Sequence, residues 1–240
     1  MRLECIATAG GAILYDPSRL DHPSDADFDP VALADAGRVQ RAGFGRGRVW
    51  YVTGHGGGEW VLRHYRRGGL IARLFVDRYL WSGAGRTRGF RELRLLAELE
   101  QLRLPAARPV AARFRRAGLS YRADLLTVAV PGARPLAALL AAPLPPSAWR
   151  AIGGCLRAFP DRGVFHADLN AHNVLVDADG RVHLIDFDRG RRRAPGAWRA
   201  ANLARLRHSL TKLATPAAGL TSAWEQLEIG YGAPRARPPR

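Results

Sequence analysis

Three oxygen-bearing side chains are spaced along the chain in a way that suits the transfer of a phosphoryl group. Asp168 and Asn173 lie in the segment HADLNAHN (166–173), and thirteen residues after Asn173 an apolar stretch, VHLI, runs into Asp186. Phosphoryl transfer needs a carboxylate that orients the acceptor hydroxyl and oxygen ligands that hold Mg²⁺ against a triphosphate. Asp168 suits the first role, and Asn173 and Asp186 suit the second.

This segment fits H-x-D-L-x-x-x-N, and so resembles the catalytic loop of protein kinase-like phosphotransferases. Asp186 then takes the place of the metal-binding residue of D-F-G, with Asp188 in place of the glycine. The alternative is that Asp168 and Asp186 are ordinary turn or capping carboxylates. Asp188 is either a second carboxylate near the metal or an ion-pair partner of Arg189.

Two histidines belong to the same segment. We expect His166 to be structural and to pack beneath the loop. His172 lies beside the metal positions, but a hard magnesium ion prefers oxygen, so we do not expect it to be a ligand.

A kinase also needs a cation on a strand to hold the nucleotide phosphates, and a helical glutamate to hold that cation. The segment EWVLRHY (59–65) offers Arg63 where V-A-I-K has its lysine, and the only lysine of the chain, Lys212, lies in the other half. Glu92 is the matching helical acid. The alternative is a surface salt bridge. An arginine makes a forked contact that a lysine cannot.

The glycine-rich loop that covers the nucleotide has two candidates. Backbone amides approach phosphates closely at glycine. AGFGRGR supplies Gly43, Gly45 and Gly47, and GHGGG supplies a second cluster at 54–58. We favour the first, because it precedes the two strands that it should link. Backbone groups near Val128–Ala133 should bind adenine.

The elements that must position these residues follow from hydrophobic periodicity and turn residues. Strands are predicted at 48–53, 59–65, 107–116 and 120–130, helices at 88–102, 135–141, 147–159, 198–213 and 221–229, and a strand hairpin at 173–188. The first 40 residues are acidic and turn-rich, a poor match to any regular element. The pattern predicts one α+β, two-lobed protein kinase-like domain: a strand-rich N-lobe (about 1–131), a reduced helical C-lobe (about 136–232) and a loose tail (233–240).

Composition limits the possible partners and compartments. The 240 residues include 37 basic and 21 acidic ones, a net charge of +16, and this field favours anionic partners. Nucleic acid would also suit the charge, but no recognised binding module is present. Two cysteines, Cys5 and Cys155, exclude a disulfide framework. We expect neither a signal peptide nor a transmembrane helix, since the start is weakly apolar and prolines interrupt 124–150.

Five segments together resemble the bacterial 3-deoxy-D-manno-octulosonic acid (Kdo) kinases, which are related to the core heptose kinases. They are VLRHYRRGG (61–69), TRGFRELRLL (87–96), HADLNAHNVL (166–175), LIDFDRG (184–190) and NLARLRHSL (202–210). The resemblance implies ATP-dependent phosphorylation, with Mg²⁺, of the 4-hydroxyl of the Kdo sugar on Kdo-lipid A. It implies peripheral location at the cytoplasmic face of the inner membrane. It also implies that Asp168 is catalytic and that Arg63 replaces the usual lysine.

Residues around the catalytic-loop motif bear on which acceptor the enzyme would use. Ala167 replaces the arginine of H-R-D and no A-P-E triplet occurs, which argues against a protein kinase. An anionic glycolipid headgroup or membrane surface suits a basic cluster formed by Arg189, Arg191, Arg192 and Arg193. The alternative is a solvated charge run. A heptose kinase, an aminoglycoside-type kinase and a basic nucleic-acid-binding protein remain alternative functions, and no protein partner is predicted.

Overall fold

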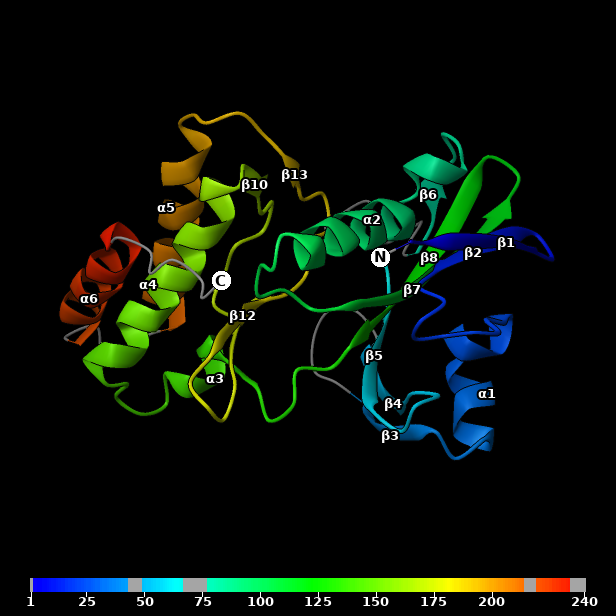
Figure 1. Ribbon diagram of the computed structural model, residues 1–240, viewed down its shortest axis with the longest axis horizontal. Coiled ribbons are helices and arrows are strands. Elements are labelled where there is room, and N and C mark those ends of the chain that lie inside the picture. Colours follow the sequence, from blue (N-terminus) through cyan, green and yellow to red (C-terminus); the bar gives the residue numbers. More distant parts are fainter. Residues whose placement is uncertain (1, 43–48, 67–76, 214–218, 234–240) are drawn as a thin grey trace. The chain divides into compact units, whose positions relative to one another are not determined.

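The structure is a computed structural model and describes residues 2–42, 49–66, 77–213 and 219–233. The chain divides into two compact units (Figure 1). Unit 1 comprises Met1–Leu102 and Ala107–Ala129, and unit 2 comprises Arg103–Ala106 and Val130–Arg240. Unit 1 is rich in strands and unit 2 is mostly helical, which confirms the predicted α+β kinase-like fold. The predicted tail lies almost entirely outside the described residues.

The elements follow one another in a simple order. Unit 1 contains β1 (Glu4–Thr8), β2 (Gly11–Tyr15), η1 (Asp25–Phe28), α1 (Pro30–Asp35), β3 (Val39–Ala42), β4 (Val49–Thr53), β5 (Glu59–His64), β6 (Tyr79–Leu80), η3 (Ala84–Arg86), α2 (Arg88–Gln101), β7 (Pro109–Ala117) and β8 (Ser120–Val128). Unit 2 contains β9 (Arg134–Pro135), α3 (Leu136–Leu139), α4 (Pro146–Asp161), β10 (Val164–Phe165), β11 (Val174–Val176), β12 (Val182–Leu184), β13 (Arg191–Arg192), α5 (Trp198–Leu213) and α6 (Leu220–Gly232).

Unit 1 is built on one antiparallel sheet. Its strand order is β1-β2-β7-β8-β5-β4-β3, and β6 pairs with β8. The predicted hairpin of β4 and β5 is present. Thr53 of β4 faces Glu59 of β5 across the turn, and the Gly54 amide donates to the Gly58 carbonyl at 2.7 Å. β5 therefore lies between β4 and β8 in the middle of the sheet, which fixes the backbone on both sides of Arg63.

Helix α2 packs on one face of this sheet. Its apolar residues recur at helical spacing, and Phe90, Leu93 and Leu99 are buried. Gly89 lets the helix approach closely, since a Cβ there would lie 3.0 Å from the Asp124 carbonyl oxygen and 3.4 Å from Ala112 Cβ. The helix predicted at 88–102 is confirmed, and it carries Glu92 on the side that faces the sheet.

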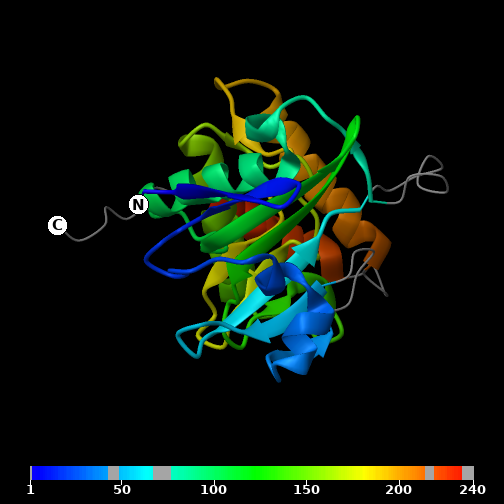
Figure 2. The same ribbon diagram turned by 90° about the vertical axis from the view of Figure 1, so that its right-hand side faces the viewer.

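The prediction that the first 40 residues lack regular structure is wrong. β1 and β2 form a hairpin that extends the sheet through β7, and η1 and α1 follow it (Figure 2). The acidic residues that suggested an exposed turn are paired: buried Asp16 lies 2.7 Å from Arg19, and buried Asp27 lies 3.0 Å from Arg38. Pairing with arginines satisfies these carboxylates, so an acidic stretch folds against the sheet.

The second face of the sheet carries its own core. Phe28 of η1 and Leu33 of α1 pack with Trp60 and Leu62 of β5 in one cluster of buried apolar residues. Side chains alternate along a strand, so these β5 residues point away from the face that Arg63 shares with α2. The amino-terminal segment covers this face of β5, and α2 covers the other, so both faces of the strand are covered.

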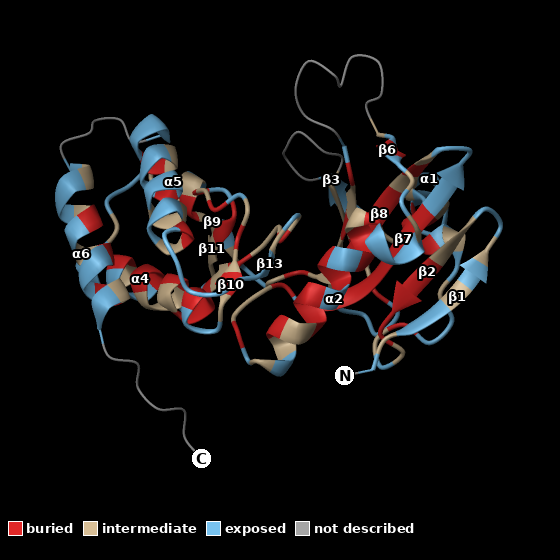
Figure 3. Ribbon diagram, turned by 90° about the horizontal axis from the view of Figure 1, so that it is seen from above, coloured by how far each residue is buried: buried red, intermediate tan, exposed pale blue. Residues whose placement is uncertain are grey.

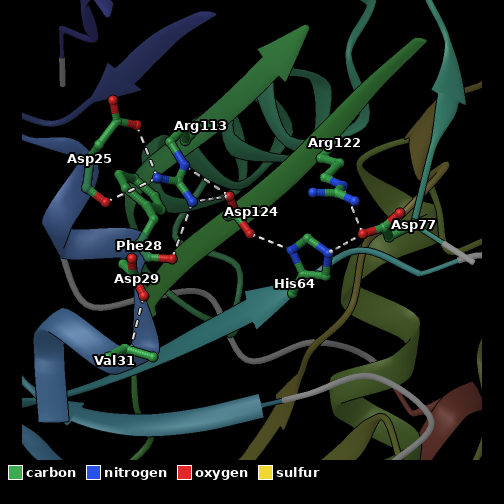
Figure 4. A network of polar contacts seen from close by, with 9 residues as sticks. All are labelled: Asp25, Phe28, Asp29, Val31, His64, Asp77, Arg113, Arg122 and Asp124. Atoms are coloured by element: carbon green, nitrogen blue, oxygen red, sulfur yellow. Dashed lines mark hydrogen bonds and ion pairs between the residues drawn. The ribbon is translucent and has the colours of Figure 1, made fainter. Parts of the chain in front are cut away.

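A ladder of charged side chains crosses this second face (Figure 4). Arg113 of β7 is 3% exposed and lies 2.8 Å from Asp124 of β8 and 2.9 Å from Asp25 of η1. Asp124 also contacts Nδ1 of His64 at 2.6 Å, and Asp77 lies 3.7 Å from Nε2 of His64. A buried charge must be paired to be tolerated, and this ladder links three neighbouring strands to η1.

Unit 2 centres on the crossing of α4 and α6. Gly153 of α4 and Gly230 of α6 lie where a Cβ atom would collide with the backbone of the other helix, at Leu227 and Arg150 respectively. The helix α5 buries Trp198, Leu206 and Leu210 along one side, as predicted. Among the described helices, none is both long and apolar enough to cross a bilayer.

Candidate active site

The loop between β10 and β11 holds Asp168 at its surface. His166 is 1% exposed and Leu169 is 4% exposed, so residues on both sides of Asp168 are buried. The Asp168 amide donates to Nδ1 of His166 at 3.2 Å, and Nε2 of His166 lies 2.9 Å from the Ile185 carbonyl oxygen. Nδ1 accepts a hydrogen bond in this arrangement, so Nε2 carries the ring hydrogen and donates to the Ile185 carbonyl. One imidazole therefore ties the Asp168 loop to the strand that leads into Asp186, which confirms its predicted structural role.

The same histidine is held in its neutral form. Burial lowers the pKa of His166 below its ordinary value, while the hydrogen bond to Ile185 and the charges of Asp186 and Asp168 act in the opposite direction. Desolvation is the larger effect because the ring is buried against Phe187, at 4.6 Å between ring centroids. Both carboxylates lie near enough to influence this ring electrostatically.

Asn173 closes the loop. Its side-chain Nδ2 donates to the Asp168 backbone carbonyl at 2.9 Å, and its own backbone carbonyl accepts from the Ile185 amide at 3.0 Å. The side chain is buried at 8% exposure. Since Nδ2 is engaged by the loop, Oδ1 is the atom of this amide that suits a cation. The hydrogen bonds thus bring the three predicted oxygen-bearing residues onto one bonded framework.

Asp186 adopts an uncommon backbone conformation. Its φ is +61°, in the left-handed region that disfavours residues with a Cβ, and Arg189 has a φ of +59°. The neighbouring residue, Phe187, is fully buried against His166 and Phe159, and the Gly190 amide donates to the Phe187 carbonyl at 2.7 Å. Such conformations persist where the surroundings impose them, typically at functional sites.

The donor chemistry of this framework fits Mg²⁺. Among the described residues, no three His, Cys, Asp or Glu side chains gather as a metal site. Mg²⁺ is ordinarily held by one or two carboxylates together with waters and substrate phosphates. Asp186 and Oδ1 of Asn173 supply such an oxygen set. The Asp188 amide lies 3.4 Å from Oδ1 of Asp186, and the role of the Asp188 carboxylate stays a prediction.

Two further elements support the loop from outside. The Ala171 carbonyl accepts from the Ala137 amide of α3 at 3.0 Å, and the Ala171 amide donates to Oγ of Ser209 on α5 at 3.1 Å. No role was predicted for Ser209, although it lies in the segment 202–210. His172 is exposed, and its amide donates to Oδ1 of Asn170 at 2.9 Å.

In unit 1, Arg63 and Glu92 form the predicted pair. Nη2 of Arg63 lies 2.5 Å from Oε2 of Glu92, and the Glu92 side chain is 2% exposed, so this is not a surface salt bridge. Sequence reasoning missed the third member, Tyr65, whose hydroxyl donates to the same oxygen at 2.6 Å. The spacing of two residues on one strand was the available signal, because it places Arg63 and Tyr65 on one face.

The predicted nucleotide-covering loop is only partly described. Gly43, Gly45 and Gly47 lie outside the described residues. The competing cluster at 54–58 forms the β4–β5 turn, where Gly57 has a φ of +80°. The segment expected to bind adenine, at 128–133, contains a turn in which the Ala133 amide lies 3.2 Å from the Val130 carbonyl oxygen.

The basic cluster of residues 189–193 lies next to the loop that carries Asp168. Arg191 and Arg192 form β13, which pairs with β10, and β10 ends one residue before His166. The guanidinium carbons of Arg191 and Arg193 lie 5.3 and 5.0 Å from the centroid of the Phe165 ring. These exposed arginines therefore stand beside the loop that carries Asp168.

Fold and site together define a protein kinase-like phosphotransferase. The model of the "Lipopolysaccharide kinase (Kdo/WaaP) family" matches residues 32–231 of this chain. The chain therefore belongs to this family. It is 48% identical over 204 residues to a 3-deoxy-D-manno-octulosonic acid kinase of Xanthomonas axonopodis pv. citri, covering 85% of this chain and 81% of the relative. Proteins of the same name from Xanthomonas oryzae pv. oryzae and Stenotrophomonas maltophilia are each 46% identical, over 226 and 206 residues. These alignments cover 92% and 85% of this chain and 89% and 81% of the relatives.

Proposed function

We propose that this protein transfers the γ-phosphoryl group of ATP to the 4-hydroxyl of the Kdo sugar of Kdo-lipid A. The observation that carries this proposal is the framework around His166, in which hydrogen bonds between side chains and backbone groups join the segments of Asp168, Asn173 and Asp186. The names of the similar proteins support the choice of a Kdo sugar.

In this proposal each side chain has one task. Asp168 accepts a hydrogen bond from the sugar hydroxyl and takes its proton as the new O–P bond forms and the bond to ADP breaks. Asn173 and Asp186 hold Mg²⁺, which neutralises phosphate charge when bound. Arg63 contacts the phosphates of ATP and Glu92 orients it. Gly43, Gly45 and Gly47 cover the nucleotide.

The acceptor lies at the cytoplasmic side of the inner membrane in this proposal. Arg189, Arg191, Arg192 and Arg193 bind its anionic headgroup, and their place beside β10 supports this assignment. Guanidinium groups form forked hydrogen bonds with carboxylates and phosphates, which suits a charged glycolipid.

A panel of acceptors tests the activity. Radiolabel from ATP should reach purified Kdo-lipid A, and not a heptosylated core that lacks a free 4-hydroxyl on Kdo, an aminoglycoside or a protein. Asp168→Asn should abolish transfer, whereas Asp179→Asn, in the exposed β11–β12 turn, should leave it unchanged. Preference for another acceptor, or full activity of Asp168→Asn, would contradict the proposal.

Acceptor binding has a separate test. Serine at Arg191, Arg192 and Arg193 together should raise the KM for Kdo-lipid A and leave the KM for ATP unchanged. Arg181→Ser is the control, because its side chain is 74% exposed in a turn on another part of unit 2. Unchanged acceptor kinetics in the triple variant would reject this role.

A further inference from the structure

Two exposed leucines lie on neighbouring segments at the outer end of the β7–β8 hairpin. Leu80 of β6 is 76% exposed and Leu119 of the hairpin turn is 83% exposed. The two segments are neighbours, because Leu80 pairs with Ser120 and the Trp81 amide donates to the Leu119 carbonyl at 2.9 Å. We call residues 78–82 and 115–120 the hairpin tip. A two-residue hairpin turn ordinarily carries polar residues, so folding alone does not call for Leu119.

The hairpin tip rests on a packed support. The Trp81 ring lies 5.1 Å from the Phe114 ring and 6.1 Å from the Tyr121 ring. The guanidinium of Arg116 lies 4.8 Å from the centroid of the Trp81 ring, and its Nε donates to the Gly118 carbonyl at 2.9 Å. Figure 3 shows the strands changing from buried in the middle of the sheet to exposed at this end. The leucines are therefore displayed on a braced hairpin end.

The charge around the leucines is positive. Residues 77–82 and 114–122 contain four arginines, at 78, 115, 116 and 122, and one acid, Asp77. Asp77 lies 2.8 Å from Nε of Arg122, so it offsets one of the four. Apolar residues beside tryptophan and arginine are the combination that enters a membrane–water interface. Anionic lipids add to this attraction, because each basic residue near the surface interacts favourably with their charge.

We propose that the hairpin tip is a membrane-docking surface that inserts Leu80 and Leu119 into an anionic lipid bilayer. The exposed leucines favour a lipid bilayer over nucleic acid as the partner, because binding to nucleic acid would use the arginines and leave the leucines without a role. The proposal rests on the proposed function in one respect: a glycolipid acceptor gives the enzyme a reason to dock on a bilayer. The docking surface belongs to unit 1, whereas the cluster at 189–193 belongs to unit 2.

Vesicle binding tests the surface with the full chain. The wild type should bind vesicles of phosphatidylcholine with phosphatidylglycerol more tightly than vesicles of phosphatidylcholine alone. Leu80→Ser with Leu119→Ser should lower the affinity at least about tenfold, since each leucine contributes apolar area to the interface. Val31→Ser on α1 is the matched control, because Val31 is also exposed, at 68%. Equal affinity for both vesicles, unchanged binding by the double variant, or an equal loss with Val31→Ser overturns the proposal.

A second measurement follows Trp81 directly. Brominated phospholipids should quench tryptophan fluorescence on binding, and Trp81→Phe should remove most of that quenching. Quenching that persists in Trp81→Phe places the inserted tryptophan elsewhere and overturns the proposal.

Kinetics separate this proposal from the proposed function. The double leucine variant should phosphorylate a deacylated, soluble Kdo acceptor at the wild-type rate and a vesicle-embedded acceptor more slowly. Equal rates on the embedded acceptor overturn the docking surface while leaving the kinase activity intact. A wild type that phosphorylates no Kdo acceptor refutes the proposed function, and the vesicle binding results still decide the docking surface.

Discussion

Removal of one hydroxyl group from the Arg63–Glu92–Tyr65 cluster gives a quantitative test of how Glu92 holds Arg63, the residue that we propose contacts the nucleotide phosphates. Oε2 of Glu92 receives a hydrogen bond from Tyr65 at 2.6 Å as well as one from Arg63 at 2.5 Å. Tyr65→Phe keeps the ring, which is 4% exposed, and keeps the contact with the Arg63 guanidinium, 4.7 Å from its centroid. The substitution therefore removes one donor to a buried carboxylate and the oxygen that accepts from Arg63.

The expected loss follows from the burial of Glu92. A hydrogen bond to a charged group contributes about 1.5–3 kcal/mol, so the free energy of unfolding should fall by about that amount. Arg63 also bonds the Tyr65 hydroxyl, at 3.3 Å, so its orientation should loosen as well. We expect the KM for ATP to rise about three- to tenfold, with kcat little changed, because the contact serves the bound nucleotide in both ground and transition states.

Steady-state kinetics and urea unfolding measure the two effects together. The KM for the acceptor should stay at its wild-type value. A general loss of folded protein would lower the apparent kcat and leave the KM for ATP unchanged, so a raised KM for ATP distinguishes the two effects. Tyr51→Phe on the neighbouring strand β4 is the matched control, since Arg41 contacts its ring face at 3.3 Å, away from Glu92. If Tyr65→Phe leaves both the stability and the KM for ATP unchanged, the hydroxyl does not hold Glu92 and this reasoning is wrong.

Two further predictions concern unit 2. Gly153→Ala should lower the free energy of unfolding by about 1–3 kcal/mol or more, because the added methyl group meets the Leu227 backbone and the helices must separate. Gly154→Ala, whose nearest neighbour would be 3.8 Å away, should be neutral or stabilising; equal losses in urea unfolding would show that the crossing is not tight. Stability should also fall as the pH drops below about 6.5, since the unfolded chain protonates His166 at its ordinary pKa while burial lowers that pKa in the folded protein. His166→Phe should be less stable at neutral pH but show a flatter pH dependence, and an unchanged slope would count against a buried neutral imidazole.

Motif spacing and hydrophobic periodicity, which are local features of the sequence, were enough to predict the helices of unit 2 and the loop that carries Asp168. The spacing of Asp168, Asn173 and Asp186 depends on short segments whose hydrogen bonds join residues close in sequence, as in the Asn173–Asp168 contact. The helix at 198–213 and the hairpin of the strands at 48–53 and 59–65 also follow from periodicity and turn residues, which act over a few positions.

The amino-terminal segment was not predictable because its partners are distant. Residues of β2 pair with residues of β7 about one hundred positions later, and Asp25 is held by Arg113 from the same strand. Acidic and turn residues indicate an exposed loop when taken locally, and only the folded sheet supplies the arginines that allow their burial. The missed role of Tyr65 has the same origin, since Glu92 meets it only when α2 packs on β5.

The glycine contact between α4 and α6 limits how the polypeptide can be shortened or joined to a tag. A fragment that stops before Leu220 would lack α6 and would expose to water the buried side of α4 around Gly153. An exposed apolar surface of this kind promotes aggregation. A fusion partner is therefore best attached beyond Gly232, where α6 has already ended.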